Sequence, residues 1–281
     1  MKSHSITVCP AGGLANRMRA IASGIALGRD TGRLVEIVWA RDSGLNAPYS
    51  LLFDPAALPV PIRGVSAAAY HLKYEVPRLL NLRLPAIYQH RHFALAHFDE
   101  PGFEDRYVGS PLLLRSEVEQ ARGDAYFFSG LDFYPFADED YRRYFRPSVT
   151  VRRRVDELAA SAPGATVALH IRRTDNANSI ASSPLSLFID AIDAEIARDA
   201  NVRFFLATDD DSTKAELSRL YPDRIYTNPA TARRDTPEGV VDALAELLLL
   251  SRMKRIYGSF FSTFSDAASR LGSIPLTICR K

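Results

Sequence analysis

The stretch VALHIRRTDN, residues 167–176, decides the fold prediction. It begins as an apolar, strand-like run and ends in one histidine, two arginines and an aspartate. Burying such charges without partners would cost several kcal/mol, so we expect them at the end of the strand. In parallel sheets, ligands bind beyond the carboxyl ends of the strands. The stretch therefore indicates a strand that ends at a binding site.

The chain after Pro147 alternates regularly between strand and helix patterns. Ser183 with Pro184, and Thr236 with Pro237, are expected to cap and open two of the helices. The predicted strands are 166–171, 202–208, 224–227, 255–259 and 275–280, and the predicted helices include 149–160, 212–221 and 263–272. This order is typical of an α/β unit with a parallel sheet.

The N-terminal forty residues predict a second unit of the same class. SITVC (5–9) reads as a strand, PAGG (10–13) as a turn, the following helix ends at Gly32, and LVEIVW (34–39) reads as the next strand. Between 45 and 145 only AYFFSG (125–130) stands out as a strand. We therefore expect two Rossmann-like domains, 1–147 and 148–281.

Composition limits the possible partners. The formal net charge of the 281 residues is +2, from 35 basic and 33 acidic residues, so no whole-chain field favours nucleic acid. The one basic run, Arg152 to Arg154, is expected as a solvated helix face. Cys9 and Cys279 lie in apolar runs and are expected as buried, reduced thiols. The N-terminus lacks the apolar core of a signal peptide and no window approaches the ~20 apolar residues of a membrane span. The expectation is a cytoplasmic protein, with peripheral membrane contact left open.

Four polar clusters follow apolar runs that read as strands. Each has an ordinary structural alternative: a common Gly-Gly turn, a core histidine, a helix cap, or hydroxyls at the start of a helix. None has the lysine of a P-loop or the spacing of a dinucleotide fingerprint. The clusters comprise Gly12, Gly13, Asn16 and Arg17; His170, Arg172, Arg173 and Asp175; Thr208, Asp209 and Asp210; and Ser259, Ser262, Thr263 and Ser265.

Taken together, these clusters resemble the GDP-fucose-dependent fucosyltransferases, in particular the α1,6 branch that includes the bacterial nodulation enzymes. HIRRTD fits the family motif H-[IV]-R-R-x-D, FLATDD fits the strand and acidic turn that follow it, and GGLANR is similar to the family's GG-x-x-N-[RQ] loop. The likeness lies in 165–270 and 8–39. It implies a GT-B fold, in which two Rossmann-like domains face each other across a cleft, with the donor bound mainly by the C-terminal domain.

The resemblance also implies roles for individual residues. Arg172 would contact the donor pyrophosphate and stabilise the leaving group, Ser262 would contact phosphate, and Glu246 would accept the two N–H donors of guanine. The implied donor-binding set is Gly12, Gly13, Asn16, Arg17, His170, Arg172, Arg173, Thr208, Asp209, Asp210, Glu246, Ser259, Ser262 and Thr263.

The implied reaction is inverting transfer of L-fucose from GDP-β-L-fucose to a hydroxyl of an oligosaccharide or lipid-linked saccharide, with release of GDP and without a metal or other cofactor. The base is left open among Asp175, Asp42 and no base at all. Two alternatives also stay open. One is a GT-B transferase with another nucleotide sugar, and the other is a non-catalytic nucleotide-sugar-binding protein.

Overall fold

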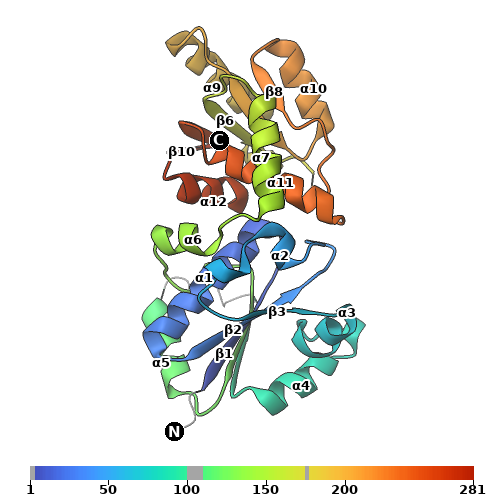
Figure 1. The fold of residues 1–281 in the computed structure, drawn as a ribbon, viewed down its shortest axis with the longest axis vertical. Coiled ribbons are helices and arrows are strands. Elements are labelled where there is room, and N and C mark those ends of the chain that lie inside the picture. Colours follow the sequence, from blue (N-terminus) through green and yellow to red (C-terminus); the bar gives the residue numbers. More distant parts are fainter. Residues whose placement is uncertain (1–3, 100–109, 175–176) are drawn as a thin grey trace. The chain divides into compact units, whose positions relative to one another are not determined.

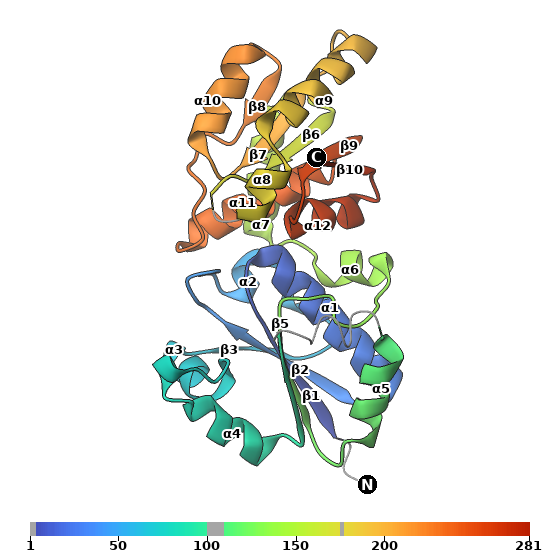
Figure 2. The ribbon, with the colours of Figure 1, turned by 180° about the vertical axis from the view of Figure 1, so that it is seen from behind.

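The computed structural model describes residues 4–99, 110–174 and 177–281 (Figure 1). The chain divides into two compact units, Met1–Arg146 and Pro147–Lys281. Each unit contains a five-stranded, wholly parallel sheet between helices (Figures 1 and 2). Two Rossmann-like units of the α/β class were predicted, and this architecture is confirmed.

The sheet of the N-terminal unit has the strand order β3-β2-β1-β5-β4. Its strands are β1 (Ser5–Pro10), β2 (Leu34–Ala40), β3 (Ile62–Val65), β4 (Leu95–Phe98) and β5 (Ala125–Ser129). Its helices are α1 (Leu14–Thr31), α2 (Tyr49–Leu52), η1 (Pro55–Ala57), α3 (Ala67–Ala69), η2 (Tyr70–Tyr74), η3 (Leu79–Asn81), α4 (Leu84–His92), α5 (Pro111–Gln120) and α6 (Asp138–Tyr144). The predicted β-α-β opening is confirmed, and Gly32 ends α1 with a left-handed φ of 65°.

The two faces of this sheet are covered by different parts of the chain. Helix α1 packs on β1 and β2, and it contacts α5 and α6 (Figure 1). The opposite face carries a cluster of aromatic side chains, in which Tyr70 and Tyr74 of η2 pack with Tyr126 and Phe128 of β5. Between 45 and 145 the sequence predicted only β5, and the remaining elements there are mostly short.

The sheet of the C-terminal unit has the strand order β10-β9-β6-β7-β8. Its strands are β6 (Val167–Ile171), β7 (Phe204–Thr208), β8 (Ile225–Thr227), β9 (Arg255–Ser259) and β10 (Leu276–Cys279). Its helices are α7 (Val149–Ser161), α8 (Ala177–Ser182), α9 (Leu185–Arg198), α10 (Asp211–Leu220), α11 (Pro237–Leu250) and α12 (Thr263–Gly272). All five predicted strands are present.

The strand order reverses within this sheet, with β7 and β8 on one side of β6 and β9 and β10 on the other, which places its helices in two layers. Helices α7, α11 and α12 pack together on one face, and α8 and α9 lie on the other (Figures 1 and 2). The apolar stripe of α9 buries Phe188 and Ile192 against Leu169 and Leu206 of the strands. Thr236 caps α11 as predicted, because its hydroxyl accepts the Gly239 N–H at 3.2 Å.

The predicted cap of α9 by Ser183 is wrong. Pro184 occupies the capping position of that helix. The buried Ser183 hydroxyl instead accepts a hydrogen bond from the Phe260 N–H, 2.8 Å away and 77 residues later in the chain. A long-range partner outcompetes the local one, and Ser183 thereby fixes the segment that follows β9.

Gly258 in β9 lets α12 approach the sheet closely. A Cβ at this position would lie 2.6 Å from the Ser265 Oγ and 2.8 Å from the Ser265 Cβ. We expect Gly258→Ala to destabilise the C-terminal unit by about 1–3 kcal/mol, the usual cost of overpacking a filled core. Urea unfolding followed by circular dichroism would measure this loss.

The control for that experiment is Gly64→Ala in β3 of the N-terminal unit. A Cβ there would meet nothing within 4 Å. We therefore expect the control to unfold at the urea concentration of the unaltered chain. Equal midpoints for Gly258→Ala and the unaltered protein would contradict the close packing of α12 on β9.

Candidate functional site

The loop after β6 is held by the strands on both sides of it. On one side, the Ser259 Oγ at the end of β9 accepts the Arg172 N–H at 3.1 Å. On the other, the Asp209 carboxylate after β7 accepts the Arg173 N–H and the Thr174 hydroxyl, each at 2.7 Å. The predicted polar residues after β6, β7 and β9 thus lie at one edge of the sheet. Asp175 lies outside the described residues.

His170 is buried beneath this loop. Its ring stacks on Phe264 with centroids 4.8 Å apart, and its Nδ1 lies 3.4 Å from the Ser262 Oγ. Burial lowers the pKa of His170 to about 4. The imidazole is therefore neutral at pH 7, so it can share a hydrogen bond with Ser262 but supplies no positive charge.

Arg172 and Arg173 directly follow β6 at this edge of the sheet. Arg173 is partly buried, and its Nη2 atom is enclosed without a hydrogen-bond partner in the described part of the chain. Burial also lowers the pKa of Arg173, although an arginine stays protonated in proteins. An enclosed guanidinium N–H without a partner is rare and costly, and it suits an anionic ligand.

The two carboxylates of the acidic turn after β7, Asp209 and Asp210, make different structural contacts. Asp210 caps α10, since it accepts the Thr213 N–H at 2.8 Å and the Ser212 and Thr213 hydroxyls at 2.6 Å each. These hydrogen bonds lower its pKa. The Thr208 Oγ1 accepts the Asp210 N–H at 3.3 Å. In this structure Asp210 is used as a helix cap and Asp209 as the anchor of the β6 loop.

The hydroxyl-rich segment after β9 leads into the N-terminus of α12. Ser262 occupies the capping position of this helix, but its side chain makes no capping hydrogen bond there. The preceding Phe261 is exposed and has a left-handed φ of 55°, a conformation that is strained for a bulky residue. Backbone N–H groups at a helix N-terminus together with the Ser262 hydroxyl are donors of the kind that hold phosphate.

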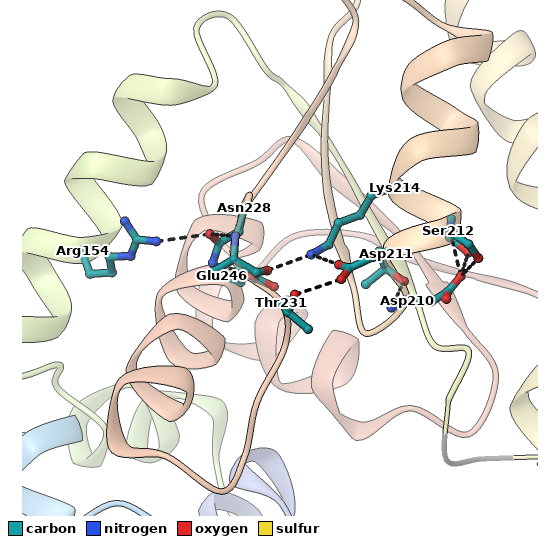
Figure 3. Close-up of polar contacts among 11 residues, drawn as sticks. Arg154, Asp210, Asp211, Ser212, Lys214, Asn228, Thr231 and Glu246 are labelled. Carbon is teal, nitrogen blue, oxygen red and sulfur yellow. Dashed lines mark hydrogen bonds and ion pairs between the residues drawn. The ribbon is translucent and has the colours of Figure 1, made fainter.

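Glu246 of α11 belongs to a separate polar network at the end of β8 (Figure 3). Its Oε1 accepts the Asn228 Nδ2–H at 2.9 Å, and the Asn228 Oδ1 accepts the Arg154 Nη2–H at 3.2 Å. Burial raises the pKa of Glu246 to about 7. The carboxyl group therefore titrates closer to neutral pH than an exposed glutamate does.

Two further residues complete this network, and the sequence did not predict them. Arg154 was expected on a solvated face, but its Nε donates to Asp242 at 2.5 Å and its side chain is 28% exposed. The buried Lys214 donates to the Ala230 carbonyl at 2.8 Å and pairs with Asp211 at 2.9 Å (Figure 3). Asn228 directly follows a strand, so the rule that located the other clusters would also have located it.

The Gly-Gly loop lies in the N-terminal unit, and there Arg17 is used internally. Its guanidinium is fully buried, donates to the Gly12 carbonyl at 2.8 Å and to the Ala40 carbonyl, and pairs with Asp42 at 2.8 Å. Gly12 has a left-handed φ of 75° and Gly13 precedes α1. Arg17 thus ties the loop after β1 to the end of β2.

Metal-binding clusters and membrane-spanning helices are both absent from the described residues. In the ranges 4–99, 110–174 and 177–281, no three His, Cys, Asp or Glu side chains gather in an arrangement that could hold a metal ion. Within those ranges no helix has both the length and the apolarity to span a bilayer.

Comparison with known proteins places the fold. No protein-family model and no curated protein matches the chain. The α1,6-fucosyltransferase NodZ, in crystals soaked with GDP-fucose, is similar over 96% of this chain and 93% of its own, with a TM-score of 0.62 and 21% identity. The chain has the GT-B fold of that fucosyltransferase. POFUT1 in complex with GDP-fucose is also similar, over 98% of both chains, with a TM-score of 0.59 and 13% identity.

The fold expected from the resemblance is therefore confirmed. NodZ from Bradyrhizobium and the apo form of POFUT1 are similar over 95% and 99% of this chain, with TM-scores of 0.61 and 0.59. In this chain, the predicted residues of the second, third and fourth clusters that the structure describes, all but Asp175, lie at the edge formed by β6, β7 and β9. The first cluster and Glu246 lie elsewhere, in the N-terminal unit and at the end of β8 respectively.

Asp209 is expected to control the order of the β6 loop. Asp209→Ala removes both acceptors of the Arg173 N–H and the Thr174 hydroxyl, whereas Asp209→Asn retains an oxygen for the first and an amide that can donate to the second. Hydrogen exchange of the peptide 167–174 should therefore accelerate at least tenfold in the alanine variant, since hydrogen bonds to charged groups contribute about 1.5–3 kcal/mol.

The asparagine variant is the control, and its exchange should stay close to that of the unaltered chain. Identical exchange in the alanine variant and the unaltered protein would show that Asp209 does not hold this loop.

Proposed function

We propose that this chain is an inverting glycosyltransferase that transfers L-fucose from GDP-β-L-fucose to a saccharide hydroxyl and releases GDP. The observation that carries the proposal is the partnerless, enclosed Nη2 of Arg173 at an edge where Arg172, Ser262 and the start of α12 also converge. The fold shared with NodZ and POFUT1, whose structures hold GDP-fucose, supports this donor.

The phosphates of GDP-fucose would be held by hydrogen-bond donors at the β6 edge. Arg172 and Arg173 carry guanidinium forks that bind phosphate oxygens in pairs. The Ser262 hydroxyl, beside neutral His170, and the first amides of α12 supply further N–H and O–H groups. Charge that develops on the leaving diphosphate would be stabilised by these fixed donors. We propose that the transfer requires no metal ion, because two guanidinium groups supply the positive charge.

The guanine base would be recognised by Glu246. A carboxylate accepts the two N–H groups on one edge of guanine together, and uracil cannot offer that pair. Asn228 already donates to the Glu246 Oε1, which fixes the plane of the carboxyl group. A fixed carboxylate distinguishes bases better than a mobile one, because a mismatched base leaves its remaining acceptor positions without donors.

The base that activates the acceptor hydroxyl is a separate part of the proposal. Asp42 pairs with Arg17 and also accepts the N–H groups of Gly44 and Leu45, at 2.8 and 3.0 Å. That carboxylate is therefore occupied by structural contacts. We assign assistance at the acceptor to Asp175, which follows the two arginines in sequence.

The acceptor is proposed to be an oligosaccharide or a lipid-linked saccharide of bacterial glycan synthesis, and the compartment to be the cytoplasm. Cys9 and Cys279 are both free and buried, as expected of thiols in a reducing compartment. Burial raises the pKa of Cys9 to about 12, so this thiol is unreactive.

Calorimetric titration with GDP, GDP-fucose and UDP, each with and without a chelator, tests the proposal. The expected result is binding of both guanine ligands, unaffected by chelator, and weak or absent binding of UDP. Preference for UDP would indicate a GT-B transferase with another nucleotide sugar. GDP-fucose binding without slow release of fucose and GDP would indicate a binding protein rather than an enzyme.

Arg172 is expected to contribute strongly to GDP affinity. Arg172→Ala should weaken GDP binding by about 1.5–3 kcal/mol, the usual contribution of a charged hydrogen bond. Arg153→Ala is the matched control. The Arg153 side chain is 79% exposed on α7, and its ion pair with Glu157 is long, at 3.6 Å, and exposed to solvent. Calorimetry should give the control the affinity of the unaltered chain. Equal GDP affinity in the two variants would remove Arg172 from the donor site.

Glu246 is expected to couple GDP binding to proton release. In the free protein its pKa is about 7, and guanine N–H donors stabilise only the ionised form. Below pH 7 binding must therefore displace a proton, so GDP affinity should rise with pH up to about 7 and then level off. The rise is at most tenfold per pH unit for one proton.

Glu246→Gln is the control, since the phosphate of GDP also titrates near pH 6 and contributes equally to both proteins. The difference between the two pH profiles isolates the carboxyl group. Profiles that run parallel from pH 5 to 8 would show that Glu246 does not meet the base.

A further inference from the structure

Residues 70–92 of the N-terminal unit expose an unusual number of large apolar side chains. Leu79, Leu80 and Leu82 are 80%, 95% and 79% exposed, and Ile87 is 68% exposed. Leu72 and Leu84 are exposed as well. Scattered surface leucines are ordinary, but six large apolar side chains within sixteen residues form a surface that normally meets a partner.

The segment is nevertheless folded, so its exposed apolar side chains are held in fixed positions on the surface. On its inner side Tyr70 and Tyr74 are buried against β5 in the aromatic cluster. The buried Gln89 of α4 donates to the carbonyls of Lys73 and Glu75, both at 3.1 Å. Helix α4 and η2 lie side by side on one side of the sheet (Figures 1 and 2).

The turn that carries the three most exposed leucines is held by Asn81. The Asn81 Oδ1 accepts the Arg78 N–H at 2.8 Å, and its Nδ2 donates to the Val76 carbonyl at 2.9 Å. Leu82 and Arg83 both adopt left-handed φ angles, 51° and 55°, which are strained for residues with side chains. Internal hydrogen bonds thus maintain a strained turn that directs leucines outward.

The charges around these leucines are almost all positive. The segment contains Lys73, Arg78, Arg83 and Arg91 and a single carboxylate, so its formal charge is +3 (four minus one), whereas the whole chain carries +2. The one carboxylate, Glu75, is mostly enclosed and is bound by His71 at 2.7 Å and by Asn81 at 3.3 Å. Leu84, Ile87 and Arg91 follow the helical spacing i, i+3, i+7, which places them on one face of α4.

We propose that the exposed surface of residues 70–92 binds the surface of a bilayer that contains anionic phospholipid. Exposed leucines flanked by arginines match a membrane interface, where apolar side chains enter the acyl boundary and guanidinium groups pair with phosphate headgroups. The exposed leucines project singly and provide no shape that a protein partner would have to match. A bilayer surface does not require such a match. The surface belongs to the N-terminal unit and does not depend on the donor nucleotide.

Vesicle flotation with the full chain tests the surface. The chain should float with vesicles of phosphatidylcholine and phosphatidylglycerol at low ionic strength, and much less with phosphatidylcholine alone. The variant Leu79→Ser, Leu80→Ser, Leu82→Ser should lose at least tenfold in vesicle affinity. Arg78→Gln with Arg83→Gln should lose roughly 25-fold in affinity for anionic vesicles, about fivefold for each arginine.

The matched control is Leu112→Ser with Leu113→Ser, which changes two other exposed leucines, on α5 of the same unit. This control should bind vesicles like the unaltered chain. Binding that is equal in the triple-serine variant and the unaltered chain, or a loss that is equal in the control, would overturn the proposal. Absence of binding to anionic vesicles at low ionic strength would also overturn it.

Two further measurements distinguish membrane contact from other occupants. A fluorophore on Leu80→Cys should shift to shorter wavelength with anionic vesicles, and one on Leu112→Cys should not; the two native cysteines are buried. Sedimentation without lipid should show one species for the unaltered chain and for the triple-serine variant. A dimer that only the unaltered chain forms would assign the surface to a second copy and overturn the membrane assignment.

Discussion

The fixation of the β6 loop by its two neighbouring strands is the interaction on which the candidate site depends. Asp209 from β7 and Ser259 from β9 each accept one backbone N–H of that loop. The topology makes this possible, because β6 is the central strand of the sheet and its end is flanked on both sides. Because the backbone N–H groups of this loop are already bonded, a ligand can bind at this edge without rearranging the loop backbone.

Hydrogen bonds within the protein distinguish polar residues with a structural role from candidate ligand-binding residues. Asp209, Asp210 and Arg17 have hydrogen-bond partners within their own units, which explains how Arg17 is tolerated in a fully buried position. Arg173 retains an enclosed nitrogen without a partner among the residues described. Glu246 is bonded to Asn228 through one oxygen, but burial still raises its pKa, so its ionised form would be stabilised by further N–H donors. Sites that cost stability in this way are where a ligand is expected.

The C-terminal unit was predictable from sequence because its elements are long and locally encoded. Its strands are apolar runs with helices between them, and Thr236 capped α11 as its sequence indicated. Ser183 was misassigned because its partner, the Phe260 N–H, is 77 residues away. Residues 45–145 were not predictable for a similar reason. Their short elements are fixed by tertiary contacts, such as the packing of Tyr74 on Tyr126, which leave no local periodicity.

The two proposals concern different units and different physics, and together they narrow the acceptor. The β6 edge offers directed cationic and hydroxyl donors, which suit one charged donor molecule. The surface of residues 70–92 offers leucines and dispersed arginines, which suit a large anionic plane. A transferase that used a freely diffusing oligosaccharide would gain nothing from the second surface. A transferase whose acceptor is anchored in a bilayer would gain effective concentration, because both would then diffuse in the same plane. Membrane contact by residues 70–92 therefore favours the lipid-linked saccharide over the free oligosaccharide.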